Sequence, residues 1–142
     1  MSNNKETIRR YYEEVFNQGK LEVLDEIVAR DHVEHNPLPG QTQGLDGLKQ
    51  RVAMVRGAFN PQFTLEDVLA DADKVVVRWT NSGTHLADWF GVPATGRTVV
   101  VSGIDIHQLR DGKMAEHWDV VDIFGLMVQI GGIPVPGGVP AS

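Results

Sequence analysis

Residues 98–123 read TVVVSGIDIHQLR-DG-KMAEHWDVVDI, and they contain the clearest structural signal of the chain. Asp111-Gly112 stands between two segments that are rich in β-branched and alternating apolar residues. An Asp-Gly pair in that setting is typical of a two-residue turn between antiparallel strands. We therefore predict a hairpin, with one strand over about 98–110 and the returning strand over 113–123.

The turn also predicts which side chains share a face of the hairpin. With a two-residue loop, residues whose numbers add to 223 lie opposite one another, so Asp105 would face Trp118. One face then mixes apolar and ionisable groups, as a small-molecule pocket requires: Val101, Asp105, His107, Leu109, Met114, Glu116, Trp118 and Asp122. The other face carries Ile104, Ile106, Ala115, His117, Asp119 and Val121. A bulge near Gly112 or Gly103 would exchange the faces on one strand, so alternation favours the first face without settling the choice.

The rest of the chain divides into helices followed by strands. Three segments repeat apolar residues at helical spacing: 4–16, 21–29 and 45–59. After Pro61 the spacing changes to two, which predicts strands: about 63–69 and 75–85. A brief extended segment, residues 31–35, precedes Asn36-Pro37. Helices followed by an antiparallel meander predict an α+β fold, with the helices packed on one face of a curved sheet.

Composition limits the kind of protein. The 142 residues suit one domain, which we expect over 1–131, followed by a Gly/Pro-rich tail over 132–142 at the surface or at a subunit contact. With a net charge of −6, the chain lacks the excess of basic residues that is typical of nucleic-acid-binding proteins. The sequence has no cysteine, which excludes disulfides and thiolate catalysis. We see neither a signal peptide nor an apolar stretch of ~20 residues, so we expect no membrane contact and a cytoplasmic location.

Asp122 is the first candidate for chemistry. It ends the last predicted strand and precedes the apolar run Ile123-Phe124-Gly125-Leu126-Met127. A carboxyl group in an apolar cavity has a raised pKa, which makes it a usable proton shuttle near neutral pH. The alternative is that Asp122 caps the following turn or pairs with an arginine.

Five further residues are candidates for the same pocket. His107 could orient a carbonyl or exchange a proton with a carboxylate, because an imidazole titrates near neutral pH. Asp105 could hold an imidazole in one tautomer. His35 and His85 could border the cavity, and Trp118 could contact a ligand. Each also has a structural alternative as a loop, strand or core residue, and Glu116 and His117 are most simply the solvated face of a strand.

Motifs of other chemistries are missing from the sequence. No HExxH helix, phosphate-binding loop, GxGxxG fingerprint or GxSxG elbow is present, and the pairs His32/His35 and His107/His117 are weak metal signals. We therefore expect acid/base chemistry that uses neither a metal nor a cofactor.

Taken together, the motifs resemble the SnoaL-like polyketide (ester) cyclases of the nuclear transport factor 2-like superfamily. The resemblance covers most of the chain up to about Gly131 and rests on these segments: Tyr11–Asn17 with Gly19, Val33–Pro37, Gly83–His85, Gly91–Arg97 and Asp111–Asp122. It implies a cone of helices on a strongly bent antiparallel sheet that encloses a pocket. It also implies a homodimer or higher homo-oligomer, usually formed through the outer face of the sheet.

The resemblance further implies a reaction. Cyclases of this kind close a ring by intramolecular aldol condensation, with an aspartate as general acid/base and no cofactor, on a small apolar or aromatic carbonyl substrate. The matching positions here are Asp122 for the aspartate and His107 for a histidine on the preceding strand. Ala94 stands where a proline is common, which leaves the substrate open. The same fold hosts other acid/base enzymes, such as epoxide or lactone hydrolases and isomerases, and non-catalytic binding modules.

Overall fold

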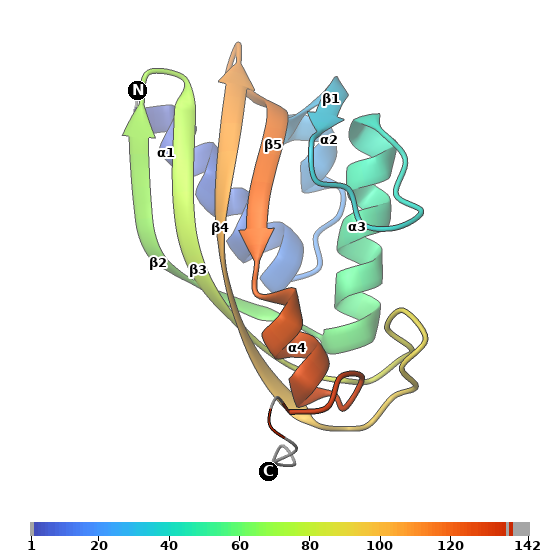
Figure 1. The fold of residues 1–142 in the computed structure, drawn as a ribbon. Helices are drawn as coiled ribbons and strands as arrows, with labels where there is room; N and C mark the ends of the chain where they lie inside the picture. Colours follow the sequence, from blue (N-terminus) through green and yellow to red (C-terminus); the bar gives the residue numbers. More distant parts are fainter. Residues whose placement is uncertain (1, 136, 138–142) are drawn as a thin grey trace.

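A computed structural model describes residues 2–135 and residue 137 of the chain. Figure 1 shows helices packed against one face of a single sheet, with a short helix at the end of the last strand. In chain order the elements are α1 (Ser2–Arg10), the π-helix η1 (Tyr11–Asn17), α2 (Val23–Ile27), β1 (Val28–Glu34), α3 (Gly44–Phe59), β2 (Gln62–Asp71), β3 (Lys74–Thr84), β4 (Thr98–Arg110), β5 (Lys113–Val121) and α4 (Ile123–Gln129).

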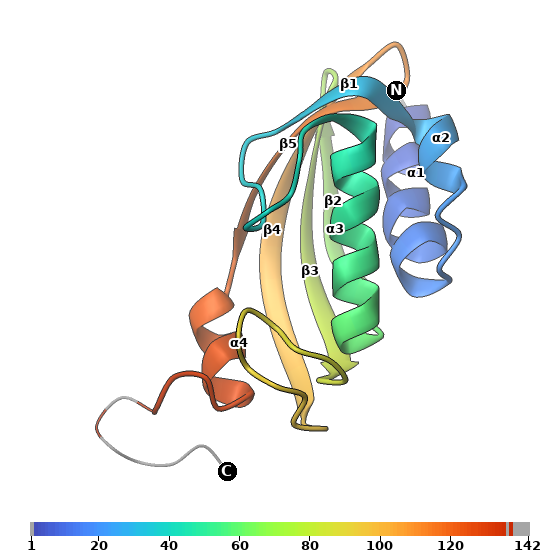
Figure 2. The ribbon, with the colours of Figure 1, turned by 90° about the vertical axis from the view of Figure 1, so that its right-hand side faces the viewer.

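The sheet has the order β1-β5-β4-β3-β2. Strands β2 to β5 form the antiparallel meander that the alternating spacing predicted. The extended segment near residues 31–35 is longer than expected and becomes β1, which pairs parallel to β5. Figure 2 shows the bent sheet with α1 and α3 on the same side. The predicted α+β class, with helices on one face of a curved sheet, is confirmed.

The core fills the space between the helices and the inner face of the sheet. Its most completely buried apolar residues come from nearly every element: Ile8, Val15, Leu24, Val28, Leu48, Val52, Val75, Val77, Leu109 and Met114. Burying a side chain of this size stabilises a fold by about 1.5–3 kcal/mol. These residues therefore hold the helices against the sheet and fix the walls of the space between them.

The first helix changes its winding at Tyr11. The predicted helix over 4–16 is present, but its second half is the π-helix η1, whose wider turn is rare and often occurs at functional sites. Tyr11 and Tyr12 are adjacent in sequence, and both are buried, together with Val15 and Phe16. The winding thus directs two neighbouring tyrosines towards the interior.

The closing hairpin corrects the expected register of β5. Asp111 and Gly112 adopt positive φ angles of 53° and 78°, as the predicted turn requires. Leu109 pairs with Met114, but Gln108 pairs with Glu116, so one extra residue bulges β5 at Ala115. Beyond this bulge the paired numbers add to 224 instead of 223.

The bulge exchanges the two faces of β5 while leaving β4 as expected. His117 and Asp119, which were expected on the outer face, point inwards beside His107 and Asp105. The prediction that Glu116, Trp118 and Asp122 share the inner face with Asp105 is therefore wrong, because successive side chains of a strand alternate between faces.

Two expectations concern the ends of the chain. Strand β5 stops at Val121, and the apolar run 123–127, expected to surround Asp122, lies in α4. Most of the predicted tail, 132–142, falls on residues 136 and 138–142, which lie outside the described residues. Within the described part of the chain, every helix is too short or too polar to cross a membrane.

Candidate active site

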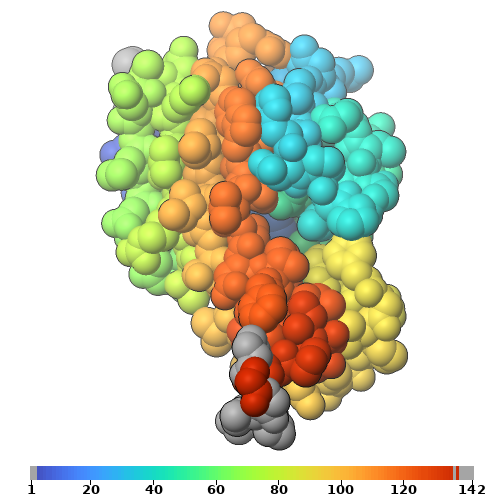
Figure 3. All heavy atoms as spheres, in the orientation of Figure 1, coloured from blue at the N-terminus to red at the C-terminus, as the bar shows by residue number. Residues whose placement is uncertain are grey.

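A pocket lies between η1, α3 and the inner face of the sheet. In Figure 3 the surface is hollowed where three parts meet: β5, α3 and the segment that follows β1. The blue N-terminal helical segment is visible at the bottom of the hollow. Most of its wall is apolar or aromatic. The wall residues with ionisable or hydroxyl groups are Tyr11, Tyr12, Arg51, Asp105, His117 and Asp119.

Asp105 is held on the inner wall by Tyr12 and His117. The Tyr12 hydroxyl donates a hydrogen bond to Asp105 Oδ2 and lies 2.8 Å from His107 Nε2. Burial raises the pKa of Asp105, but its contacts with His117, His107 and Tyr12 outweigh burial and lower the pKa below its usual value. With Asp105 ionised, Tyr12 donates to the carboxylate and accepts from His107 Nε2–H.

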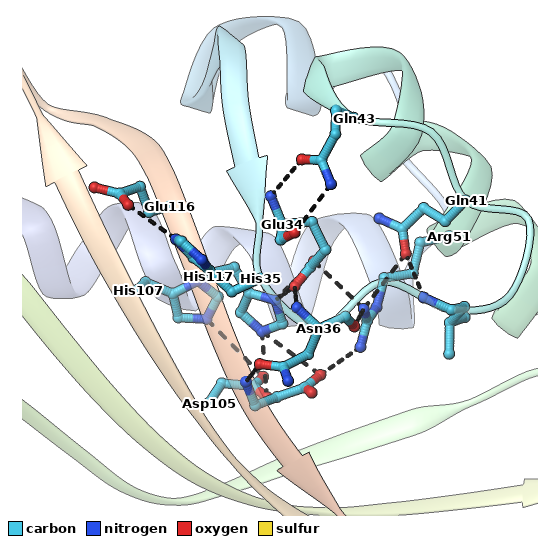
Figure 4. A network of polar contacts seen from close by, with 12 residues as sticks. Glu34, His35, Asn36, Gln41, Gln43, Arg51, Asp105, His107, Glu116 and His117 are labelled. Carbon is cyan, nitrogen blue, oxygen red and sulfur yellow. Dashed lines mark hydrogen bonds and ion pairs between the residues drawn. The ribbon is translucent and has the colours of Figure 1, made fainter.

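His117 stands between two carboxylates. Its Nδ1 lies 2.7 Å from Glu34 Oε2, and its Nε2 lies 3.4 Å from Asp105 Oδ1 (Figure 4). Burial lowers the pKa of His117, but its contacts with Asp105 and Glu34 prevail and raise the pKa to about 9. His117 is therefore an imidazolium at neutral pH, and it forms part of the pocket wall.

Asp119 pairs with Arg51 at the pocket wall. Arg51 Nη2 donates to Asp119 Oδ2, and Arg51 Nη1 lies 3.3 Å from Glu34 Oε1. Burial raises the pKa of Asp119 above its usual value, although Arg51 and His117 act in the opposite direction. Of the two pocket aspartates, Asp119 is thus the stronger base, while Asp105 is the one held as an anion.

The segment after β1 fixes this arrangement. Asn36 accepts from the Asp119 backbone N–H through its Oδ1, at 2.9 Å, and accepts from Arg51 through its backbone oxygen, at 3.1 Å. Gln43 bonds to both the backbone N–H and the backbone oxygen of Glu34. These contacts tie β1 and α3 to β5 (Figure 4).

The structure brings only one of the six predicted site residues to the pocket wall, namely Asp105. His107 is fully buried behind Tyr12, and burial lowers its pKa to about 3, so it is neutral. His85 is also fully buried, where its ring stacks on Phe59 and its Nδ1 contacts Thr95 Oγ1 at 3.0 Å.

His35 and Trp118 lie together outside the pocket wall. Their rings stack at 4.4 Å, and His35 Nε2 contacts Glu116 Oε1 at 2.9 Å. Trp118 follows the bulge at Ala115 and therefore points away from Asp105. Both contacts are surface packing, which differs from the expectation that these two side chains border the ligand.

Asp122 lies outside the pocket, contrary to expectation. It is exposed, and its Oδ1 accepts a hydrogen bond from Gly125 N at 2.9 Å, which caps the N-terminus of α4. The expectation that this carboxyl group is sequestered in an apolar cavity is therefore wrong. Strand β5 ends at Val121, one residue before Asp122, and the apolar residues that follow form α4. From this helix Ile123 and Leu126 line the pocket, whereas Asp122 does not.

Sequence reasoning missed Glu34, Arg51, His117 and Asp119. Two of the motifs already contained the signal, because Glu34 lies in Val33–Pro37 and the pair His117 and Asp119 lies in Asp111–Asp122. Arg51 carried no signal, since one arginine in an amphipathic helix is indistinguishable from a solvated one. Only the packing of α3 on β1 and β5 brings it to Asp119.

Asp105, His107 and His117 also form a possible metal-ligand group, with one donor atom each within 4.8 Å of one another. The Tyr12 hydroxyl lies between Asp105 and His107 and bonds to both. An ion held by these two residues would have to displace this buried hydroxyl, so the donor set fits a hydrogen-bonded network better than a metal centre.

Comparison with known proteins agrees with this architecture. The model of the SnoaL-like polyketide cyclase family matches residues 6–130. Aklanonic acid methyl ester cyclase DnrD of Streptomyces peucetius is 31% identical over 140 residues, covering 92% of each chain. Nogalonic acid methyl ester cyclase of Streptomyces nogalater is 31% identical over 121 residues, covering 82% of this chain and 89% of the relative.

A solved structure shows the same fold. TsrD from Streptomyces laurentii superposes with a TM-score of 0.85 at 28% identity, covering 93% of this chain and 97% of that chain. The family match extends over nearly all the described elements, from α1 to α4. The chain therefore belongs to the SnoaL-like polyketide cyclases and is an enzyme of that family.

Proposed function

We propose that the protein closes a ring in a polyketide-like ester by intramolecular aldol condensation, with Asp119 as the general acid/base. The observation that carries this proposal is the position of Asp119, a buried carboxyl group with a raised pKa on the wall of a largely apolar pocket, next to two cations. The related chains named as methyl ester cyclases support the reaction class.

Asp119 suits proton transfer better than Asp105. A base is most effective when its pKa approaches the working pH, and burial moves the pKa of Asp119 in that direction. Asp105 is held ionised by Tyr12 and His117, so its proton affinity is reduced. Its role is to keep His117 charged and oriented.

The reaction can be followed atom by atom. Asp119 takes a proton from a carbon that lies between the ester carbonyl and a second carbonyl, which breaks the C–H bond and leaves an enolate. The enolate carbon attacks a carbonyl carbon of the same molecule and forms the new C–C bond. The resulting alkoxide takes the proton back from Asp119, so no atom is lost and the carboxylate is regenerated.

The two cations of the wall stabilise the intermediates. His117 Nε2 lies 3.8 Å from Asp119 Oδ2, and Arg51 bonds to the same carboxyl group. Negative charge that moves from Asp119 to the enolate oxygen stays close to both. Prepositioned charges of this kind lower a barrier because they need no reorganisation during the reaction. The overall change is not a redox reaction, so the proposed mechanism calls for no electron-carrying cofactor.

The test measures turnover of aklanonic acid methyl ester and nogalonic acid methyl ester by two variants, each with one aspartate replaced by asparagine. We expect Asp119→Asn to lower kcat by about 10²–10⁴-fold, as for loss of a positioned acid/base group. Asp122→Asn is the matched control, and we expect it to stay within a few-fold of the unsubstituted protein. Circular dichroism verifies that both variants fold.

Two results would contradict the proposal. One is turnover by Asp119→Asn that is close to the unsubstituted rate. The other is a loss of turnover in Asp122→Asn as large as the loss in Asp119→Asn.

A further inference from the structure

The pocket contains a second polar region, away from Asp119. It consists of Trp79 and Asn81 on β3 and Trp89 in the segment between β3 and β4, all of which line the pocket. Among the described residues, Trp79 Nε1, Asn81 Oδ1 and Trp89 Nε1 are buried and have no hydrogen-bond partner. A buried polar group without a partner destabilises a fold, so three such groups on one wall call for an explanation.

Packing holds the two indole rings in place. Trp79 lies across Gly103, where an added Cβ would stand 2.3 Å from Trp79 Cζ2, and it meets Phe63 edge-on at 4.9 Å. Trp89 meets Phe59 edge-on at 4.9 Å. Both tryptophans are only 5% exposed. These contacts leave the indole rings little freedom to turn towards another protein partner.

The strand register gives the separation of the two polar regions. Asp119 pairs with Asp105 on β4, so Asp105 marks the level of the first region. Asp105 pairs with Val77, whereas Asn81 pairs with Val101. Four residues along β4 therefore separate the two levels, which corresponds to about 13 Å of extended strand. A flat molecule of several fused rings spans such a distance.

We propose that Trp79, Asn81 and Trp89 form a specificity site for an oxygen substituent at the end of an aromatic substrate opposite the ring that closes. A phenolic hydroxyl fits the donors and acceptors of this site. It donates to Asn81 Oδ1 and accepts from an indole N–H, which satisfies buried groups that are otherwise unpaired. The inference rests on the proposed function for the orientation of the substrate, with its reacting end at Asp119. Binding at the specificity site is nevertheless measurable without turnover.

The experiment measures binding of two flat probes, 2-hydroxyanthracene and anthracene, which differ by one hydroxyl group. Fluorescence titration of the unsubstituted protein should show about five- to tenfold tighter binding of the hydroxylated probe, the effect of a net hydrogen bond of about 1–1.4 kcal/mol. Asn81→Leu removes the acceptor at similar volume. It should bring the two affinities within about twofold of each other.

Further variants control the result. Trp79→Phe removes the indole N–H and should also reduce the preference, which keeps the test informative if Asn81→Leu does not fold. Ser82→Ala changes an exposed neighbour on the same strand and should preserve the preference. Equal affinities in the unsubstituted protein, no binding of either probe, or an undiminished preference in both pocket variants would overturn the specificity site. The last of these results is expected if the three atoms bind only water.

Asp119→Asn separates this inference from the proposed function. We expect this variant to lose turnover and to keep the preference for the hydroxylated probe. Turnover retained by Asp119→Asn contradicts the aldol mechanism alone. A missing preference alongside lost turnover contradicts the specificity site alone.

Discussion

His107 and His117 have rings stacked at 4.9 Å, yet their pKa values move in opposite directions. Burial lowers the pKa of His107 to about 3. The same burial acts on His117, but Glu34 and Asp105 raise its pKa to about 9. The difference comes from the neighbours. His117 lies between two carboxylates, whereas His107 contacts a neutral phenol and lies beside the charged His117, which lowers its pKa further. One charged and one neutral imidazole therefore lie side by side.

The pH dependence of catalysis follows from this difference. Activity needs an ionised Asp119 and a protonated His117, so kcat/KM should fall at low pH as Asp119 is protonated and should fall again above about pH 9 as His117 loses its proton. Glu34→Gln removes one of the carboxylates that raise the pKa of His117. Its alkaline limb should therefore move to lower pH.

Glu116→Gln is the control for this prediction, since Glu116 pairs with the exposed His35 instead of His117. The measurement is the pH profile of kcat/KM for the three proteins. An alkaline limb that stays in place in Glu34→Gln would show that His117 does not set it.

Among the elements, β5 decides the site. Its bulge at Ala115 directs His117 and Asp119 inwards, and its end at Val121 leaves Asp122 to begin α4. Alternation along the sequence is symmetric between the two faces, so a single extra residue reverses the assignment. A bulge has no reliable sequence signature, which is why Asp105 on β4 was placed correctly and the residues beyond Ala115 were not.

The role of Asp122 in α4 is open to a stability test. Asp122→Ala removes the side chain that accepts from Gly125 N and should lower the free energy of unfolding by about 1 kcal/mol. For a chain of this size that corresponds to a fall in Tm of roughly 3 °C. Asp122→Asn should restore most of the loss, because asparagine caps helices nearly as well as aspartate. Thermal unfolding with equal Tm values for Asp122→Ala and the unsubstituted protein would contradict this role.

At the scale of the whole molecule, the outer face of the sheet exposes several apolar side chains. Ile104 on β4 pairs with Val120 on β5, and Val100 lies on the same face of β4. Val120 is 78% exposed. Contiguous exposed apolar residues commonly mark an interaction surface. We propose that a second copy of the chain packs here, as the family resemblance implies.

Sedimentation velocity tests this assembly. We expect the unsubstituted protein to sediment as a dimer or higher oligomer. The double variant Ile104→Glu/Val120→Glu should sediment as a monomer, because charges buried without partners oppose association. Leu86→Glu is the control, as Leu86 is exposed in the segment between β3 and β4. A monomeric unsubstituted protein, or an unchanged distribution in the double variant, would rule out this interface.

The sequence by itself determined the helices that cover the sheet, the four strands of the meander, the Asp111-Gly112 turn, the α+β class and the family, because each depends on local spacing or on motifs within one segment. It also identified Asp105. The tertiary structure alone decided the remainder of the site. Glu34, Arg51 and Asp119 are distant in sequence and meet only where β1, α3 and β5 pack together. Their pKa values and their access to the pocket depend on burial and on partners across that packing, which no local pattern of residues encodes.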